Sequence, residues 1–147
     1  MTSPAGTLET RDMVFPAHAN HHGTLFAGQG LERMARAAFL AARDAAGCDV
    51  VMAAVTGVQF CAPVPVGRAL ALRAWVSRVG RSSLTVCVHG LAQAPGCPDE
   101  LALQGVFEMV AVNAHGRPTA IAHTYLNTPP HPFRQEPPEA PPTPQPP

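Results

Sequence analysis

The chain has 147 residues, of which 46% are hydrophobic, and ten basic and ten acidic side chains give it a formal net charge of +0. This length has room for one hydrophobic core, so we expect a single globular domain. All the basic side chains are arginines, and they are scattered rather than clustered, which argues against nucleic acid as a partner.

The N-terminal fifteen residues contain no basic region followed by a continuous apolar segment. No stretch of the sequence approaches the roughly 18 apolar residues that a membrane-spanning helix requires. The sequence therefore predicts a cytoplasmic protein without a membrane segment.

The first half of the chain contains a candidate strand over residues 6–15 and one long helix. The helix is predicted over Gln29–Ala46, because apolar residues recur there at spacings of three and four: Leu31, Met34, Ala35, Ala38, Phe39 and Ala42. Gly47 follows the last of these turns and suits a left-handed C-terminal cap.

Strands dominate the second half. Residues 50–60 and 101–113 are apolar runs, whereas residues 70–77 and 84–89 alternate with period two and predict strands with one buried face, formed by Leu70, Leu72, Ala74, Val76, Leu84, Val86 and Val88. Tight turns are predicted at residues 79–83 and at 113–117, where Gly116 would supply a positive φ. One helix against a five-stranded antiparallel sheet is an α+β domain.

The composition changes after Asn127. Residues 128–147 hold ten of the seventeen prolines, so we expect a folded domain over 1–127 and a disordered or polyproline-like tail over 128–147. The tail contains P-x-x-P spacings such as Pro138 to Pro141, which could dock on an SH3-type groove or belong to a purely solubilising segment.

The cysteines and histidines do not predict a metal site or a cofactor. The four cysteines are widely spaced without C-x-x-C, which favours buried thiols over disulfides or zinc: Cys48, Cys61, Cys87 and Cys97. No carboxylate or cysteine completes a ligand set with the loop histidines His18, His21 and His22.

The stretch "AHANHHGTLFAG" at residues 17–28 directly precedes the helix and has the composition of the rim of a site. Negative charge that develops on a carbonyl oxygen during a reaction can be stabilised by amide donors, and Asn20 and the Ala27–Gly28 turn can supply them. Gly23, Gly28 and Gly30 permit close approach of the backbone to a ligand, although glycines before a helix can also mark a simple turn.

Four motifs in order, "NHHGTLFAGQGLERMARAAFLAA", "VQFCAPVPVGRAL", "VSRVGRSS" and "VAVNAHGRP", together resemble the hotdog-fold acyl-CoA thioesterases over about residues 10 to 120. The resemblance implies a central helix wrapped by an antiparallel sheet, pairing of two copies into a double hotdog, and often a trimer of such dimers. It also implies acyl-CoA as the substrate and no cofactor.

In the proteins that this chain resembles, the asparagine of an N-x-x-G loop orients the carbonyl, and a helix carboxylate of the partner subunit activates water. The loop matches at Asn20 and Gly23, but the family's Met-Asp pair reads Met34-Ala35 here. Glu32 could replace the missing base, or could simply pair with Arg36. His21 and His22 are further candidate bases.

The "VGRSS" turn offers a guanidinium and hydroxyl groups for a phosphate of coenzyme A. The alternative interpretation is an ordinary polar hairpin without a binding role. The predicted catalytic residues are Asn20, Gly28, Glu32 and His22. The predicted substrate-binding residues are Gly23, Thr24, Phe26, Gly80, Arg81, Ser82 and Ser83.

Two functions fit these observations, and a third fits them less well. The first is an acyl-CoA thioesterase, and the second is a catalytically weak acyl-CoA-binding or regulatory protein that has kept the pocket and lost the base. The third, a CoA-dependent dehydratase, would need a histidine and acid pair that the sequence does not show.

Overall fold

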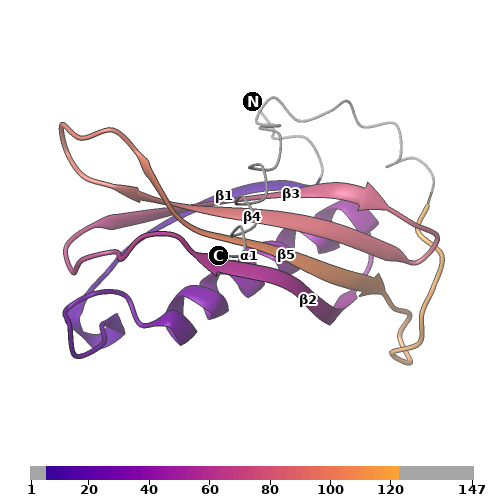
Figure 1. Ribbon diagram of the computed structural model, residues 1–147. Coiled ribbons are helices and arrows are strands. Elements are labelled where there is room, and N and C mark those ends of the chain that lie inside the picture. The colour runs from indigo at the N-terminus through magenta and orange to yellow at the C-terminus, as the bar shows by residue number, and fades with distance from the viewer. Residues whose placement is uncertain (1–5, 123–147) are drawn as a thin grey trace, which may run out of the picture.

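The computed structural model describes residues 6–122, which form one helix and one sheet (Figure 1). In chain order the elements are β1 (Thr7–Met13), a short 3₁₀ turn (Pro16–His18), α1 (Ala27–Ala46), β2 (Val50–Phe60), β3 (Ala69–Val79), β4 (Ser83–Gln93) and β5 (Glu100–Ala111). The sheet order is β1-β3-β4-β5-β2, and all neighbours are antiparallel. The predicted α+β hotdog fold is confirmed.

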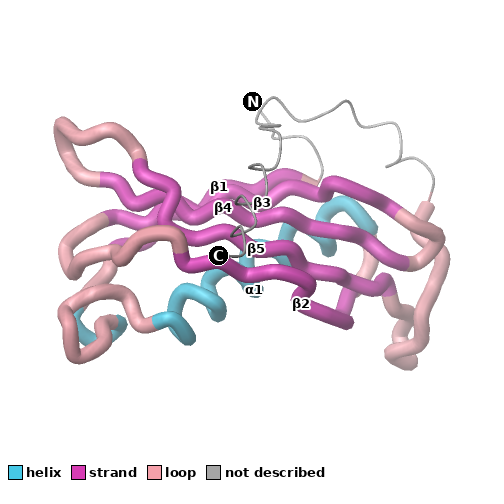
Figure 2. Tube along the Cα trace, in the orientation of Figure 1, coloured by secondary structure: helices cyan, strands magenta, loops and turns pink. Residues whose placement is uncertain are grey.

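The long helix lies across one face of the sheet (Figures 1 and 2). It starts two residues before the predicted Gln29, after Phe26, whose extended backbone forms the N-cap without a side-chain hydrogen bond. It ends as predicted at Gly47, which has a φ of 67° and donates its N–H to the Arg43 carbonyl at 3.0 Å.

The core lies between α1 and the sheet. Every second residue of β4 is buried from Leu84 onward, and the inner residues of β3 and β5 continue this face across the sheet. Phe107, Met34 and Leu84 are among the largest side chains that are fully buried. The predicted alternation of β3 and β4 is therefore confirmed for Leu70, Leu72, Ala74, Leu84, Val86 and Val88.

Two sequence-based expectations about burial are wrong. The helix buries Ala37, Ala41 and Ala45, whereas Leu31 of the predicted stripe is exposed and Ala35 and Phe39 are only partly buried. The thiols of Cys61 and Cys97 are exposed, because Cys61 follows the end of the edge strand β2 and Cys97 lies in the β4–β5 hairpin.

The two ends of the sheet carry different loops (Figure 2). The loop before α1, the β2–β3 connection and the β4–β5 hairpin gather at one end, and the β3–β4 turn lies at the other. Among residues 6–122 no helix is long and apolar enough to cross a membrane. The predicted proline-rich tail and its P-x-x-P spacings lie outside the described residues.

Candidate active site

The Asn20 side chain organises the loop that precedes α1. Its Oδ1 accepts the N–H groups of His22 at 2.9 Å and Thr24 at 3.2 Å, and its Nδ2 donates to Thr24 Oγ1 at 3.0 Å. Because Nδ2 carries two hydrogens and Thr24 takes one, the other has no partner among residues 6–122. The amide is thus fixed in orientation with one donor to spare.

Backbone contacts hold this loop to the rest of the molecule. Gly23 has a φ of 75°, donates to the Asn20 carbonyl at 3.1 Å and accepts the Val66 N–H at 3.0 Å. Leu25 donates to the Val64 carbonyl at 2.8 Å. Gly23 is therefore explained by its left-handed backbone, with open space where a Cβ would lie.

The first turn of α1 provides further donors. Gly30 makes the first helical hydrogen bond, to the Phe26 carbonyl at 3.1 Å, so the N–H groups of Ala27, Gly28 and Gln29 have no partner in the described part of the chain. A Cβ on Gly28 would come within 2.9 Å of the Phe26 ring. Glycine at this position therefore leaves room for the ring beside the amides.

A cavity of about 300 Å³ opens beside Asn20 and the start of α1. Its walls are largely apolar, with Leu25, Phe26 and Ala27 on one side and the end of β2 with Leu103 of β5 on the other. The cavity brings Asn20, Phe26 and the helix N-terminus together, and Thr24 adjoins it through its hydrogen bond to Asn20. Amide donors at the rim of an apolar cavity can polarise a carbonyl whose chain lies inside.

None of the three candidate bases lines this cavity in a single chain. Glu32 pairs with Arg36 at 2.7 Å and its side chain is 52% exposed. The His22 ring is exposed and packs on His21 with the ring centroids 3.9 Å apart. The described residues contain no group of three or more histidine, cysteine or acidic side chains that could hold a metal ion.

The "VGRSS" turn lies far from Asn20 within one chain. Gly90 of β4 is level with Phe60 at the cavity, since both align with Leu103 of β5, and seven residues of strand separate Gly90 from Ser83. At about 3.3 Å per residue this is roughly 23 Å. Gly80, Arg81, Ser82 and Ser83 therefore cannot share a small ligand with Asn20 unless a second chain contributes one of the two groups.

Sequence reasoning missed the far wall of the cavity, formed by Phe60, Cys61 and Leu103. One sequence signal was available, since Gly30 sits where a Cβ would meet Leu103 at 3.2 Å and Phe60 at 3.6 Å. A glycine inside the first turn of a helix indicates such a close approach, but does not say to which strand.

The sequence matches the family model described as "Thioesterase superfamily" over residues 22–97. It is also 33% identical, over 120 residues, to a Zymomonas mobilis protein named as an uncharacterized acyl-CoA thioester hydrolase, covering 81% of this chain and 80% of that one. The chain belongs to the thioesterase superfamily. The recognition made from the four sequence motifs is confirmed.

Solved thioesterase structures share the fold. The acyl-CoA hydrolase of Staphylococcus aureus, in complex with butyryl-CoA, coenzyme A and coenzyme A disulfide, superimposes with a TM-score of 0.77 at 30% identity, covering 80% of this chain and 72% of that one. The hexameric thioesterase y2039 of Yersinia pestis gives a TM-score of 0.73 at 28% identity, covering 77% and 93%. Variants of the S. aureus enzyme replace an asparagine, an aspartate or a threonine by alanine.

Proposed function

We propose that this protein hydrolyses acyl-CoA thioesters to the free acid and coenzyme A. The observation that carries the proposal is the fixed amide of Asn20 in the lining of the 300 Å³ cavity, close to the first N–H groups of α1, those of Ala27, Gly28 and Gln29, which have no partner among residues 6–122. The acyl-CoA hydrolases among its relatives support the choice of substrate.

In this proposal the acyl chain lies in the cavity, and the thioester carbonyl faces Asn20 Nδ2 and the first amides of α1. Water adds to the carbonyl carbon, and the same donors stabilise the negative charge on the oxygen. The C–S bond then breaks, and the thiolate of coenzyme A takes up a proton. A preorganised donor of this kind typically contributes roughly 10²- to 10³-fold in rate.

This chain lacks the helix carboxylate that the family resemblance implies as the water-activating group. The asparagine and aspartate replaced in the S. aureus variants are separated by the same number of positions as Asn20 and Ala35. The replaced threonine follows at the spacing of Met52 after Ala35. Neither alanine nor methionine can accept a proton from water, so His22 of the Asn20 loop is the proposed base, with Glu32 as the alternative.

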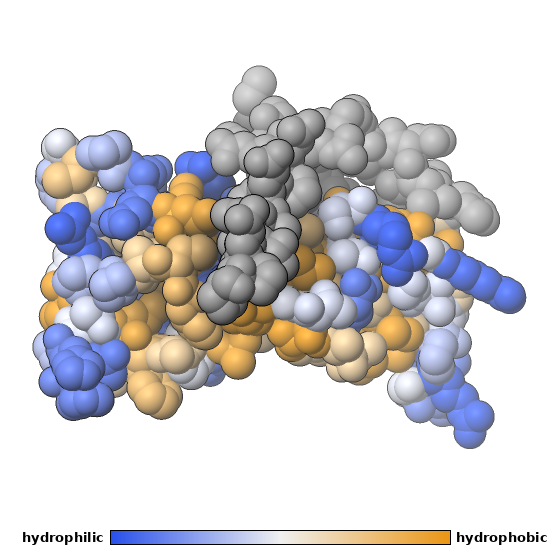
Figure 3. Space-filling model, viewed as in Figure 1, coloured by the Kyte–Doolittle hydropathy of each residue, from blue (hydrophilic) through white to orange (hydrophobic). Residues whose placement is uncertain are grey.

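A second copy completes the proposed site. The edge strand β2 is eleven residues long and exposes Val51, Met52, Val55 and Phe60, and apolar surface extends along it in Figure 3. The opposite edge, β1, is short and carries Glu9, Arg11 and Asp12. A long apolar edge invites pairing with another strand, whereas charged residues protect an edge.

Antiparallel pairing of two β2 strands would extend the sheet across a two-fold axis. Such pairing brings the start of one β2, with the neighbouring β3–β4 turn, to the end of the other, where Asn20 lies. Arg81 and Ser82 of the second copy could then hold a phosphate of the coenzyme A bound at Asn20. We propose a homodimer as the functional unit, and the hexameric Y. pestis thioesterase supports further assembly into a trimer of dimers.

The test is a screen of acyl-CoAs of increasing chain length, in which free thiol release and binding by calorimetry are measured on the same samples. Thiol release well above the rate without protein is expected for at least one substrate. Saturable binding without release would favour the acyl-CoA-binding alternative. If no acyl-CoA were either bound or hydrolysed, both the thioesterase and the acyl-CoA-binding function would be contradicted. We also propose that the protein acts in the cytoplasm, as the sequence predicts, and in fatty acid metabolism.

A further inference from the structure

A second cavity, of about 660 Å³, lies at the same end of the sheet and has no role in the proposed hydrolysis. It opens between the β2–β3 connection and the β4–β5 hairpin, and shares only Pro63 with the cavity at Asn20. Pro63, Pro65 and Pro98 form part of its walls. Because proline fixes its own φ, these walls are shaped in advance of any ligand.

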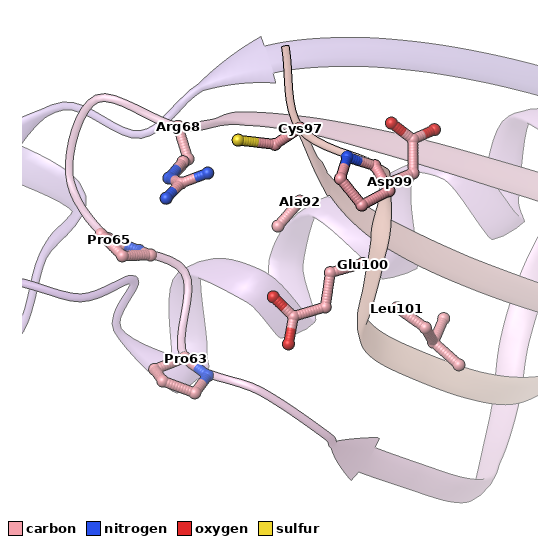
Figure 4. Close-up of a pocket in the computed structure, with 9 residues that line it drawn as sticks. Pro63, Pro65, Arg68, Ala92, Cys97, Asp99, Glu100 and Leu101 are labelled. Atoms are coloured by element: carbon pink, nitrogen blue, oxygen red, sulfur yellow. The ribbon is translucent and has the colours of Figure 1, made fainter. Parts of the chain in front are cut away.

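Two opposite charges face this cavity without pairing. Arg68 and Glu100 both line it, and neither side chain has a hydrogen-bond or ion-pair partner among residues 6–122. Figure 4 shows the two side chains on different walls. Asp99 is different, since it accepts a hydrogen bond from Gln93 Nε2 at 3.0 Å and its carboxylate turns away from Arg68 in Figure 4.

These charges define the class of ligand. A phosphate would be attracted by Arg68 but repelled by Glu100 and the nearby Asp99, which argues against the nucleotide end of coenzyme A. A ligand with both a carboxylate and an ammonium group can pair with Arg68 and Glu100 at once. The cavity thus matches a small zwitterion with an α-amino-acid head group.

The third polar group is the Cys97 thiol, which is exposed and points toward the Arg68 side chain in Figure 4. We propose that this cavity binds small disulfides with amino-acid head groups, of which cystine is the simplest, and that Cys97 is the site of their attachment. The Cys97 thiolate attacks one sulfur of the bound disulfide, whose S–S bond breaks as the mixed disulfide forms. The other half leaves as a thiolate and takes up the proton that Cys97 lost.

The chain contains its own control for thiol reactivity. Cys61 is also an exposed thiol and lines the cavity at Asn20 rather than this one, so its rate serves as the reference for each reagent. The protein is treated separately with L-cystine, with cystamine, which has only ammonium groups, and with 3,3'-dithiodipropionate, which has only carboxylates. Peptide mapping by mass spectrometry gives the rate at each cysteine, and the Cys97 rate is divided by the Cys61 rate.

L-cystine can form one exposed charge pair more than either single-charge reagent, and a pair of ordinary strength predicts a ratio roughly two- to fivefold higher for L-cystine. Arg68→Gln should lower the ratio for L-cystine and dithiodipropionate but not for cystamine. Glu100→Gln should lower it for L-cystine and cystamine but not for dithiodipropionate. Asp99→Asn is the matched control and should leave all three ratios nearly unchanged.

An unaltered Cys61 rate in each variant checks that the fold is intact. Equal ratios for the three reagents in the wild type would overturn the proposal. It would also be overturned if neither Arg68→Gln nor Glu100→Gln changed the ratios, or if Asp99→Asn acted like Glu100→Gln.

Discussion

Asn20 and Thr24 hold each other through both ends of the Asn20 amide: Nδ2 donates to Thr24 Oγ1 at 3.0 Å, and Oδ1 accepts the Thr24 N–H at 3.2 Å. These contacts fix the orientation of the Asn20 amide. If the amide were flipped by 180°, Nδ2 rather than Oδ1 would face the N–H groups of His22 and Thr24, and those two donors would lose their acceptor. The free hydrogen of Nδ2 therefore has a defined direction, as an oxyanion donor requires.

Removing the Thr24 hydroxyl should loosen this direction without removing the donor. Thr24→Val keeps the shape but loses the hydrogen bond from Asn20 Nδ2, so we expect kcat to fall roughly five- to tenfold, the effect of one hydrogen bond. Thr24→Ser retains the hydroxyl and should stay close to wild type. The kcat values are measured by steady-state thiol release from the best acyl-CoA substrate. Equal rates for Thr24→Val and Thr24→Ser would show that the hydroxyl has no positioning role.

Ala35→Asp places a carboxylate at the position that corresponds in spacing to the aspartate replaced in the S. aureus variant. Ala35 is only partly buried, so an acid there should be tolerated if it borders the substrate. We expect kcat to rise at least tenfold, which corresponds to about 1.4 kcal/mol of barrier. A folded, substrate-binding Ala35→Asp protein that is no faster than wild type would point to another base, with Glu32→Gln and His22→Ala the next variants to assay.

A charge on β2 should weaken the proposed dimer. Val55 of β2 and Met13 of β1 are each 45% exposed and lie on opposite edges of the sheet, which makes them a matched pair. Val55→Lys should raise the dimer dissociation constant by more than about tenfold, because a buried unpaired ammonium is costly, and Met13→Lys should not. Sedimentation equilibrium measures both, and an undisturbed Val55→Lys dimer would place the interface elsewhere.

His89 should make the fold sensitive to acid. Its ring packs edge-on against Trp75, with the ring centroids 4.8 Å apart. Burial lowers the pKa of His89 below the ordinary value of 6.5, and the positive charge of the neighbouring Arg73 lowers it further. The unfolded chain therefore binds a proton at His89 at a higher pH than the folded chain, and stability is lost as pH falls below about 6.5. Thermal melts from about pH 7.5 to 5.5 should fall more steeply for wild type than for His89→Gln. If the melting temperatures of wild type and His89→Gln fell in parallel with pH, His89 would not be the source of the acid sensitivity.

The strands were predictable because their residues alternate with period two, but their places in the sheet were not. The apolar run of residues 50–60 has the composition of a buried central strand, yet β2 is an edge strand. Strand order depends on which pairings bury most surface, and no local pattern records it. The apolar spacing of Leu31, Ala35 and Phe39 likewise predicts a buried helix face, whereas in one chain Leu31 is exposed and Ala35 and Phe39 are only partly buried.

The candidate site was predictable where it is local in sequence. The Asn20 loop and the start of α1 lie within ten residues of each other, and their motif marks them. The wall formed by Phe60 and Leu103 exists only because β2 and β5 pair in one register. The large distance between Arg81 and Asn20 also depends on how the strands pair. The sequence alone therefore does not reveal that these two predicted subsites lie far apart in one chain.

Asn20→Asp tests the central claim most directly. An aspartate keeps the oxygen that accepts the His22 and Thr24 N–H groups, and Thr24 can donate its hydroxyl to the second oxygen, so the loop should persist while the donor is lost. Single-turnover thiol release from the best acyl-CoA should slow roughly 10²- to 10³-fold, with the melting temperature nearly unchanged. A folded Asn20→Asp protein that releases thiol at the wild-type rate would contradict the assignment of Asn20 as the carbonyl-polarising group.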